Sequence, residues 1–268
     1  MIKTAIIGAA GRMGINLINC VLADPELELS GAVEYNAHPD LGKDIGLIIG
    51  KGETGIILTD NIANVANQSD AIIDFSSADS AADNAKVCAE TDTAFVLGTT
   101  GVSEESTKIM QELASKNGRI VFAPNMSIGV NLLFHLSSKV AKILGTDYDI
   151  EVVEMHHRRK KDAPSGTAVR MAEILADARG LSYQDDVKHG REGFTGERTV
   201  DEIGVHALRG GDVVGDHTII YAADGERVEL THKASSRETF AKGALRAVKF
   251  LHKASPALYD MQDVLGLK

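Results

Sequence analysis

The sequence lacks tryptophan, and aromatic residues make up only 4% of its 268 residues. Proteins that bind single-stranded nucleic acid without sequence preference stack bases on aromatic side chains, so this composition disfavours that class. Acidic residues outnumber basic residues by 38 to 28, which gives a net charge of −10. Binding of nucleic acid through general electrostatic attraction is therefore disfavoured as well. We expect no nucleic-acid partner.

Cysteine is also scarce, and so are long apolar runs. Only Cys20 and Cys88 are present, which excludes a disulfide framework and argues against a metal site built on sulfur. The nine His form no HExxH pair and no Cys/His cluster at ligand spacing, so we predict no metal. The amino terminus has no signal-peptide pattern, and no segment approaches the roughly 20 apolar residues of a membrane span. We expect a cytoplasmic protein with no membrane partner.

The remaining composition is that of an ordinary globular protein, with 44% hydrophobic and 25% charged residues. The length suits one large domain or two modest ones. Up to residue 123, short β-branched runs alternate with helical patterns, which is typical of βαβ units and a parallel sheet. Strands are predicted at 3–7, 29–34, 55–58, 71–75, 94–97 and 119–123, and helices at 12–23, 79–90 and 103–117.

The pattern changes after Pro124. Helices are predicted at 127–144, 165–179 and 237–253, and strands at 148–155, 201–207, 213–223 and 226–232. Neighbouring strands, the last two joined by a hairpin turn at Asp224-Gly225, predict an antiparallel or mixed sheet. Residues 182–217 are rich in glycine and polar residues, and we expect a functional loop there.

These patterns predict an α/β protein in which a Rossmann-like parallel sheet carries an inserted α+β domain. The first domain is placed at residues 1–126 plus 238–268, because the final helix is expected to return to it, and the second at 127–237.

A glycine turn follows the first predicted strand. Gly8, Gly11 and Gly14 have the spacing GxxGxxG, and a strand-to-helix turn of this kind brings the backbone and free helix amides close to a pyrophosphate. Glu34 stands 20 residues after Gly14 at the end of the second strand, where an acid accepts hydrogen bonds from the adenosine ribose. The order of these features predicts a nicotinamide dinucleotide site, and the alternative is that the glycines only make a tight turn.

The choice between NADH and NADPH depends on the residues beside this acid. Tyr35 follows Glu34, where an NADP-preferring site usually has an arginine for the 2′-phosphate. Because a carboxylate repels that phosphate, we predict a preference for NADH, although Arg12 offers NADPH a cation. Loops at 98–101 and 123–126 also follow predicted strands, at the edge where doubly wound folds bind ligands. They suit a nicotinamide and its ribose, unless they are plain turns.

Residues 156–161 read His-His-Arg-Arg-Lys-Lys, a dense run of cations in an acidic protein. Ser165-Gly166-Thr167 then opens a helix, so that clustered charge and helix amides lie next to each other. A ligand with two carboxylates can use both. Histidine side chains can exchange protons near neutral pH, which makes His156 and His157 candidates for this role, and Lys160 can donate a proton if its neighbours lower its pKa. The alternatives are a solvated charged face and a nuclear-localisation or nucleic-acid patch.

The most specific motif is HHxxKxDAPSGTA, which occupies residues 156–168. Together with GAAGRMG at 8–14 and GTTG at 98–101, it resembles the family of 4-hydroxy-tetrahydrodipicolinate reductase, also called dihydrodipicolinate reductase. Further matching segments are 125–131, 190–193, 203–207, 209–212 and 215–218, so the resemblance covers essentially the whole chain.

The resemblance implies an enzyme of lysine and diaminopimelate biosynthesis. It implies hydride transfer from NAD(P)H to C4 of a cyclic dicarboxylate, with loss of the 4-hydroxyl as water. His156 resembles the family's proton donor or acceptor, Lys160 its proton donor and His157 a ligand of a substrate carboxylate. Gly166 and Thr167 resemble the donors to the other carboxylate.

The same resemblance implies the cofactor contacts and the assembly. The cofactor contacts that it implies are Gly8, Ala9, Ala10, Gly11, Arg12, Met13, Glu34, Gly98, Thr99, Thr100, Ala123, Pro124, Asn125 and Met126. The family is commonly a homotetramer built through the second-domain sheet, so that residues 127–237 are expected to bind substrate and to form the oligomer. Some members have arginine in place of Tyr35, which leaves the choice between NADH and NADPH open.

Two other functions fit parts of the sequence. Another nicotinamide-dependent reductase of a small cyclic dicarboxylate or imine could share the first domain, because a fold alone does not fix a substrate. The motif at 156–168 argues against it. A nucleotide-sensing or redox-sensing regulator is the non-enzymatic alternative, and the acidic balance disfavours a DNA-binding version.

Overall fold

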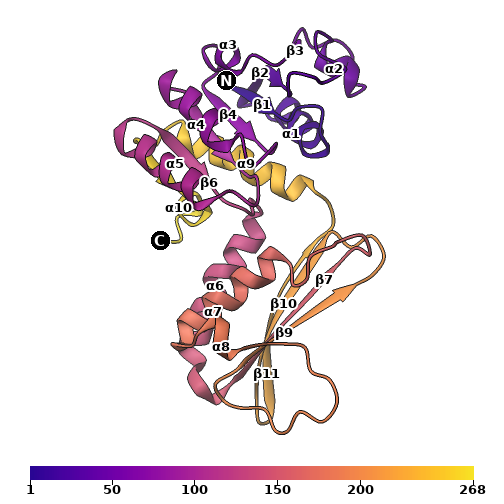
Figure 1. Ribbon diagram of the computed structural model, residues 1–268, viewed down its shortest axis with the longest axis vertical. Coiled ribbons are helices and arrows are strands. Elements are labelled where there is room, and N and C mark those ends of the chain that lie inside the picture. The colour runs from indigo at the N-terminus through magenta and orange to yellow at the C-terminus, as the bar shows by residue number, and fades with distance from the viewer. The chain divides into compact units, whose positions relative to one another are not determined.

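The computed structural model describes residues 1–268, which divide into two compact units (Figure 1). The first unit comprises Met1–Ile128 and Arg237–Lys268, and the second comprises Gly129–Ser236. No helix in either unit combines the length and the apolar character needed to span a bilayer.

A seven-stranded parallel sheet forms the centre of the first unit, with the strand order β12-β6-β5-β4-β1-β2-β3. Its strands are β1 (Ile2–Ile7), β2 (Leu27–Val33), β3 (Leu58–Thr59), β4 (Ala71–Asp74), β5 (Ala94–Leu97), β6 (Arg119–Phe122) and β12 (Ala257–Tyr259). The helices are α1 (Arg12–Ala23), α2 (Ile45–Ile48), α3 (Ile62–Ala66), α4 (Ala81–Glu90), α5 (Glu104–Lys116), α9 (Glu238–Leu251) and α10 (Met261–Leu265).

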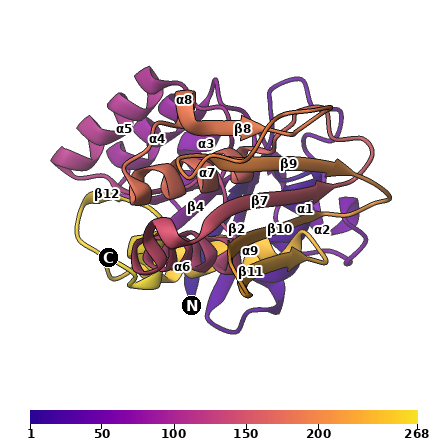
Figure 2. The same cartoon turned by 90° about the horizontal axis from the view of Figure 1, so that it is seen from below.

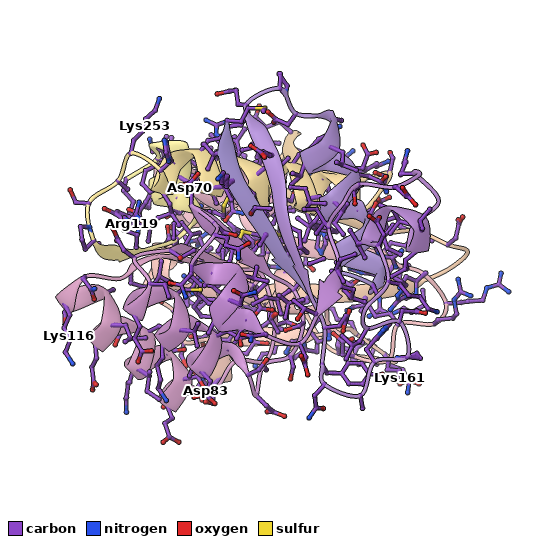
Figure 3. All side chains as sticks on the ribbon, turned by 90° about the horizontal axis from the view of Figure 1, so that it is seen from above. Asp70, Asp83, Lys116, Arg119, Lys161 and Lys253 are labelled. Carbon is purple, nitrogen blue, oxygen red and sulfur yellow. The ribbon has the colours of Figure 1, made fainter.

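Both faces of this sheet are covered, and each has its own apolar core (Figure 1). Helices α1, α9 and α10 contribute Leu17, Val248 and Met261 to one core, while α4 and α5 contribute Cys88 and Met110 to the other. Strands β4 and β5 are buried at every residue, as expected for the middle of a parallel sheet that is covered on both faces. Charged side chains such as Asp83 and Lys116 project outward from α4 and α5 (Figure 3).

The second unit contains a five-stranded mixed sheet with the order β11-β10-β7-β9-β8, which Figure 2 shows. Its strands are β7 (Asp149–His156), β8 (Val187–His189), β9 (Ile203–Arg209), β10 (Gly215–Ala223) and β11 (Glu226–Ala234). Strands β8, β9 and β7 are parallel, whereas β10 runs antiparallel to both β7 and β11. The helices are α6 (Ile128–Leu144), α7 (Gly166–Arg179) and α8 (Tyr183–Asp186), and a 3-10 turn spans Gly145–Asp147.

One face of this second sheet packs against helices α6 and α7. Every second residue of β7 is buried, and Ile150 and Val152 join Leu133 of α6 and Met171 of α7 in the core. This alternation is the pattern of a strand with one covered face. It also places Glu154 and His156 on the covered side at the carboxyl end of β7, beyond the apolar residues.

The predicted fold class is confirmed, because a Rossmann-like parallel sheet and a separate mixed sheet are both present. The long predicted strands and helices are found within a few residues of their predicted ends. The loop predicted within 182–217 is shorter than expected, since α8 and β8 lie within it, whereas the strand predicted at 201–207 is found as β9. Val187 of β8 is buried and pairs with Ile203, and the segment without regular structure before β9 is 190–202.

Several short elements were not predicted. They are α2, α3, α8, β8, β12 and α10, each of five residues or fewer, and the predicted strand 55–58 is instead the two-residue β3 at Leu58–Thr59. Strand β12 extends the sheet beyond β6, where Ala257 pairs with Arg119. Arg119, labelled in Figure 3, donates from Nη2 to the carbonyl oxygen of Asp92 at 2.7 Å. Such brief segments have no periodicity for the sequence to display.

Candidate functional site

The glycine turn of the first unit needs glycine at two positions. Gly8 has φ +73°, a backbone conformation that favours glycine, and a Cβ on Gly14 would lie 2.1 Å from the carbonyl oxygen of Gly8. Gly11 is the N-cap of α1 and, because it has no side chain, it cannot accept a capping hydrogen bond from the first amides of the helix. The turn therefore brings the backbone of β1 close to the start of a helix whose first amides lack a side-chain acceptor, which is the arrangement that binds phosphate.

The acid predicted at the end of β2 lies at this turn. Glu34 accepts a hydrogen bond through Oε1 from the amide of Ala10 at 3.0 Å. Tyr35 is 60% exposed, and its ring lies edge-on to that of His38, with ring centroids 5.3 Å apart. The carboxylate is thus held beside the glycine turn, with its second oxygen, Oε2, on the side of Tyr35.

A buried carboxylate supports the next loop along the same sheet edge. Asp74 ends β4 with no exposed surface and accepts hydrogen bonds from the amide and hydroxyl of Ser76 at 2.8 and 2.6 Å and from Asn84 at 2.8 Å. Burial raises the pKa of Asp74, against the effect of those hydrogen bonds. Its backbone carbonyl accepts from the amide of Gly98, and the Thr99 hydroxyl lies 3.4 Å from the same oxygen. Asp74 therefore ties the ends of β4 and β5 together.

The segment after β6 is held mainly by its backbone. Ala123 and Met126 are buried, and a Cβ at Gly243 of α9 would lie 1.7 Å from the carbonyl oxygen of Met126. Asn125 accepts a hydrogen bond from the amide of Ser127 at 2.9 Å. All predicted cofactor residues lie in the first unit at the carboxyl ends of β1, β2, β5 and β6. Ala9, Ala123 and Met126 are buried, so these three predicted cofactor contacts lie inside the first unit.

In the second unit, a buried carboxylate lies beside the predicted catalytic histidine. Glu154 has no exposed surface, and its Oε2 lies 2.5 Å from Nδ1 of His156. Arg209 of β9 donates to both carboxylate oxygens, at 2.9 and 3.0 Å, and the amide of Ser165 donates to Oε1 at 3.0 Å. Burial acts to raise the pKa of Glu154, but the hydrogen bonds from Arg209, His156 and Ser165 outweigh it and lower that pKa. The carboxylate is therefore ionised.

His156 is also packed against a second histidine. Its ring lies edge-on to that of His217 in β10, with 5.2 Å between the centroids, and Nε2 of His217 lies 3.1 Å from Oγ of Ser165. Burial lowers the pKa of His217 to about 3, so that this residue is neutral at physiological pH. Burial also lowers the pKa of His156, and the interactions with Glu154, which act to raise it, do not fully compensate.

Only one of the four consecutive cations turns inward. Arg158, Arg159 and Lys161 are exposed, and Lys161 is labelled in Figure 3. The side chain of Lys160 is 20% exposed, and its Nζ lies 2.9 Å from Asp162, whose pKa it lowers. Three of these residues therefore form a solvated charged face. Lys160, in contrast, lies close enough to His156 to lower the pKa of that histidine.

The remaining predicted substrate residues lie on either side of this cluster. His157 follows His156 directly, and its Nδ1 is buried without a hydrogen-bond partner. Ser165 caps α7, because its Oγ accepts from the amide of Ala168 at 3.2 Å, and Gly166 and Thr167 begin the helix. A Cβ at Gly166 would meet nothing within 4 Å, so the space in front of this helix end is open. An unpaired imidazole nitrogen and a helix amino terminus are both suited to a carboxylate.

Sequence reasoning assigned no role to Glu154, Arg209, His217 or Asp74. Glu154 and His156 are two residues apart on one predicted strand, which indicates that both side chains face the same side of the sheet. For Asp74, the signal is its position at the end of an otherwise apolar strand. No group of three or more His, Cys, Asp or Glu side chains is placed to hold a metal ion.

Comparison with protein families finds two matches that together span nearly the whole chain. The model described as dihydrodipicolinate reductase, N-terminus, matches residues 2–126, and the model described as dihydrodipicolinate reductase, C-terminus, matches residues 129–265. Proteins named 4-hydroxy-tetrahydrodipicolinate reductase from Hahella chejuensis and Syntrophotalea carbinolica are 48% and 47% identical to this chain, over 100% of both chains.

Solved structures give the same result for the fold. Dihydrodipicolinate reductase from Paenisporosarcina sp. TG-14, with dipicolinate bound, has a TM-score of 0.80 and 25% identity and covers 98% of each chain. The scyllo-inositol dehydrogenase from Lactobacillus casei, solved with NAD(H) and scyllo-inositol, has a TM-score of 0.56 and 12% identity and covers 100% of this chain and 94% of its own. The second likeness shows the dehydrogenase fold alone.

Proposed function

Because the chain belongs to the dihydrodipicolinate reductase family, we infer that it reduces 4-hydroxy-tetrahydrodipicolinate to tetrahydrodipicolinate with loss of water. The enzyme is an NAD(P)H-dependent oxidoreductase of lysine and diaminopimelate biosynthesis. The observation that carries this inference is that the two family models match consecutive parts of this chain, residues 2–126 and 129–265. The same chain has a glycine turn and a His/Lys cluster next to the amino terminus of α7.

The proposed reaction balances as one hydride, one proton and one water. The 4-hydroxyl leaves as water together with a proton from the adjacent ring carbon, which creates a conjugated double bond, and the reduced nicotinamide, when bound, would supply a hydride to C4. Negative charge that develops on the conjugated ring is stabilised by the nearby cations, and a proton is delivered to the adjacent carbon. Lys160 is the proton donor, and His156 exchanges a proton through its imidazole. Both lie at the carboxyl end of β7 or directly after it.

The two substrate carboxylates are assigned to two different groups of donors. The orphaned Nδ1 of His157 supports its role as the ligand of one carboxylate, because a buried imidazole nitrogen is costly to leave unpaired. Gly166 and Thr167, at the open amino terminus of α7, bind the other carboxylate through backbone and hydroxyl donors. His217 and Glu154 are both buried, and burial lowers the pKa of His217 to about 3, so that His217 is neutral and adds no positive charge to the site.

We propose NADH as the preferred cofactor, with NADPH as an alternative. The residues from Gly8 to Met13 hold the pyrophosphate, the loops at Gly98–Thr100 and Ala123–Met126 hold the nicotinamide and its ribose, and Glu34 binds the adenosine ribose. The bond from the Ala10 amide to Glu34 supports this assignment, because it holds a carboxylate beside the turn, where a 2′-phosphate would be repelled.

The two domains are assigned different roles. Residues 1–126 with 238–268 bind the dinucleotide, and residues 127–237 bind the substrate and form a homotetramer. The face of the second sheet that α6 and α7 leave uncovered supports the assembly, since Leu208 is exposed on it and Val153 and Met155 are partly exposed. We place the enzyme in the cytoplasm, which is supported by the free Cys20 and Cys88.

Inhibition by pyridine-2,6-dicarboxylate tests the substrate class. This planar diacid has the carboxylate spacing of the substrate ring, and we expect it to compete with substrate and to leave NADH binding in place. A reductase of a different small molecule, or a nucleotide-sensing regulator, would bind NADH without inhibition at millimolar diacid. That result would overturn the assignment of substrate while leaving the cofactor site intact.

A further inference from the structure

Glu154 is a charged residue buried where the apolar core of the second unit ends. It follows Ile150 and Val152 on the covered face of β7, and unlike them it has a carboxylate that is ionised and fully removed from solvent. Burying a charge is costly unless each oxygen is hydrogen-bonded. Glu154 lies directly beside the predicted catalytic imidazole of His156. Packing alone therefore does not explain why a charged residue is buried here.

Four donors surround the two oxygens of this carboxylate. Oε2 contacts Nδ1 of His156 at 2.5 Å and Nη1 of Arg209 at 2.9 Å, and Oε1 accepts from Nη2 of Arg209 and the amide of Ser165, both at 3.0 Å. Arg209 is itself fixed, because Nη2 also donates to the carbonyl oxygen of Asp162 at 2.7 Å. A planar guanidinium that binds both oxygens fixes the plane of the carboxylate as well as its charge.

This geometry determines which nitrogen of His156 carries a proton. An ionised carboxylate only accepts hydrogen bonds, so Nδ1 of His156 must be the donor, and Nε2 is left as the nitrogen that exchanges a proton. Gly215 of β10 lies on the Nε2 side, where a Cβ would be 3.0 Å from that nitrogen. Glycine at this position therefore keeps space open at Nε2.

We propose that Glu154, held by Arg209 and Ser165, is a positioning residue that fixes the orientation and tautomer of His156 and directs Nε2 toward the substrate. The proposal rests on the proposed function, in which His156 exchanges the proton of the reduction. Glu154 touches neither substrate nor cofactor in this scheme and acts only through the imidazole, in the way that the aspartate of a Ser-His-Asp triad orients the histidine.

The charges around His156 set the direction of the expected effect. Glu154 on the same strand acts to raise the pKa of His156, whereas burial, Lys160 and Arg209 act to lower it, and the neighbouring His217 of β10 is neutral. Replacing the carboxylate with an amide removes the group that favours the imidazolium ion. The pKa of His156 should then fall, and both neutral tautomers should become populated.

The test uses Glu154→Gln, with Glu151→Gln as its matched control. Glu151 lies on the same strand and is also hydrogen-bonded to arginines, Arg191 and Arg198, but it faces the opposite side of the sheet. The variant should keep its affinity for NADH, lose about 10- to 100-fold in kcat with a much smaller change in KM, and shift the pH dependence of kcat to lower pH. The control, compared at the same oligomeric state, should retain the wild-type kcat and pH profile.

A second measurement separates this proposal from the proposed function. The ¹⁵N chemical shifts of the labelled His156 ring, recorded against pH in the full-length enzyme, report its tautomer and pKa without any substrate. We expect the Nδ1–H form in the wild type and a mixture in Glu154→Gln. If that variant does not fold, Arg209→Lys, which keeps the charge and loses the fork, should give the same change to a smaller degree. An unchanged tautomer and pH profile in the folded variant overturns the proposal, whereas inactivity of the wild type with the Nδ1–H form present overturns only the proposed function.

Discussion

The carboxylate of Glu34 accepts a hydrogen bond from the backbone amide of Ala10, with 3.0 Å between Oε1 and the nitrogen. This contact joins the end of β2 to the glycine turn after β1, two segments that lie side by side because their strands are neighbours in the sheet. This contact supports the proposal that the acid binds the adenosine ribose while the turn holds the pyrophosphate.

Replacement of Glu34 should weaken cofactor binding and leave the chemical step intact. We expect Glu34→Gln to bind NADH about 10-fold less tightly, because hydrogen bonds to a charged group contribute about 1.5–3 kcal/mol and the amide retains part of them. Titration calorimetry with NADH measures this, and Glu28→Gln, an exposed residue of the same strand, serves as the control. Equal affinity of the Glu34 variant and wild type would show that this acid does not face the ribose.

Lys160 should matter for turnover far more than its neighbour in the cationic run. We expect Lys160→Ala to reduce kcat by about 10²- to 10⁴-fold, the usual contribution of a general acid, with little change in the Kd for NADH. Lys161→Ala removes the same charge from an adjacent exposed position and should retain the wild-type kcat. Steady-state kinetics of both variants check this, and an unchanged rate for Lys160→Ala would remove this residue from the mechanism.

Gly14 should not tolerate even one added methyl group. A Cβ there would lie 2.1 Å from the carbonyl oxygen of Gly8 and 2.6 Å from that of Ala9, and neither backbone atom can move without distorting the turn. We expect Gly14→Ala to lower stability by about 1–3 kcal/mol and to abolish NADH binding. Urea unfolding and NADH titration test both effects, with Leu22→Ala on an exposed position of α1 as the control. Full affinity in Gly14→Ala would contradict the proposed packing.

His217 should make the enzyme sensitive to acid. Burial lowers the pKa of His217 from 6.5 to about 3. Between these two pH values His217 is protonated in the unfolded chain and neutral in the folded chain. Stability associated with this residue is therefore present above about pH 6.5 and is lost as the pH falls toward about 3, by about 2 kcal/mol at pH 5. We expect the free energy of unfolding of His217→Gln to depend less on pH between about 7 and 5 than that of wild type or of the exposed control His252→Gln. Parallel slopes would show that His217 titrates normally.

The sequence predicted those features that depend on local pattern. The glycine turn and Glu34 could be recognised because strand, turn, helix and acid follow one another at fixed spacing, and α1, which was predicted at 12–23, has those ends in the structure. Strand β12 could not be predicted, since three residues show no periodicity and the strand is placed by long-range pairing with β6 at the sheet edge.

The side chains that hold His156 in place could not be predicted from the sequence. Arg209 is 55 residues from Glu154, and the two meet only because β7 and β9 pair in parallel with His156 opposite Arg209. No spacing in the sequence indicates this contact. The same holds for His217, which is brought to Ser165 by the antiparallel pairing of β10 with β7.

Direct turnover of the proposed substrate tests the central claim. The substrate is formed in the cuvette by the upstream synthase, and the oxidation of NADH and of NADPH is followed separately while the product is identified by mass spectrometry. We expect one NADH consumed for each tetrahydrodipicolinate formed, and a higher kcat/KM with NADH than with NADPH. No acceleration of NADH or NADPH oxidation when the synthase product is present would contradict the assignment of this chain as a 4-hydroxy-tetrahydrodipicolinate reductase.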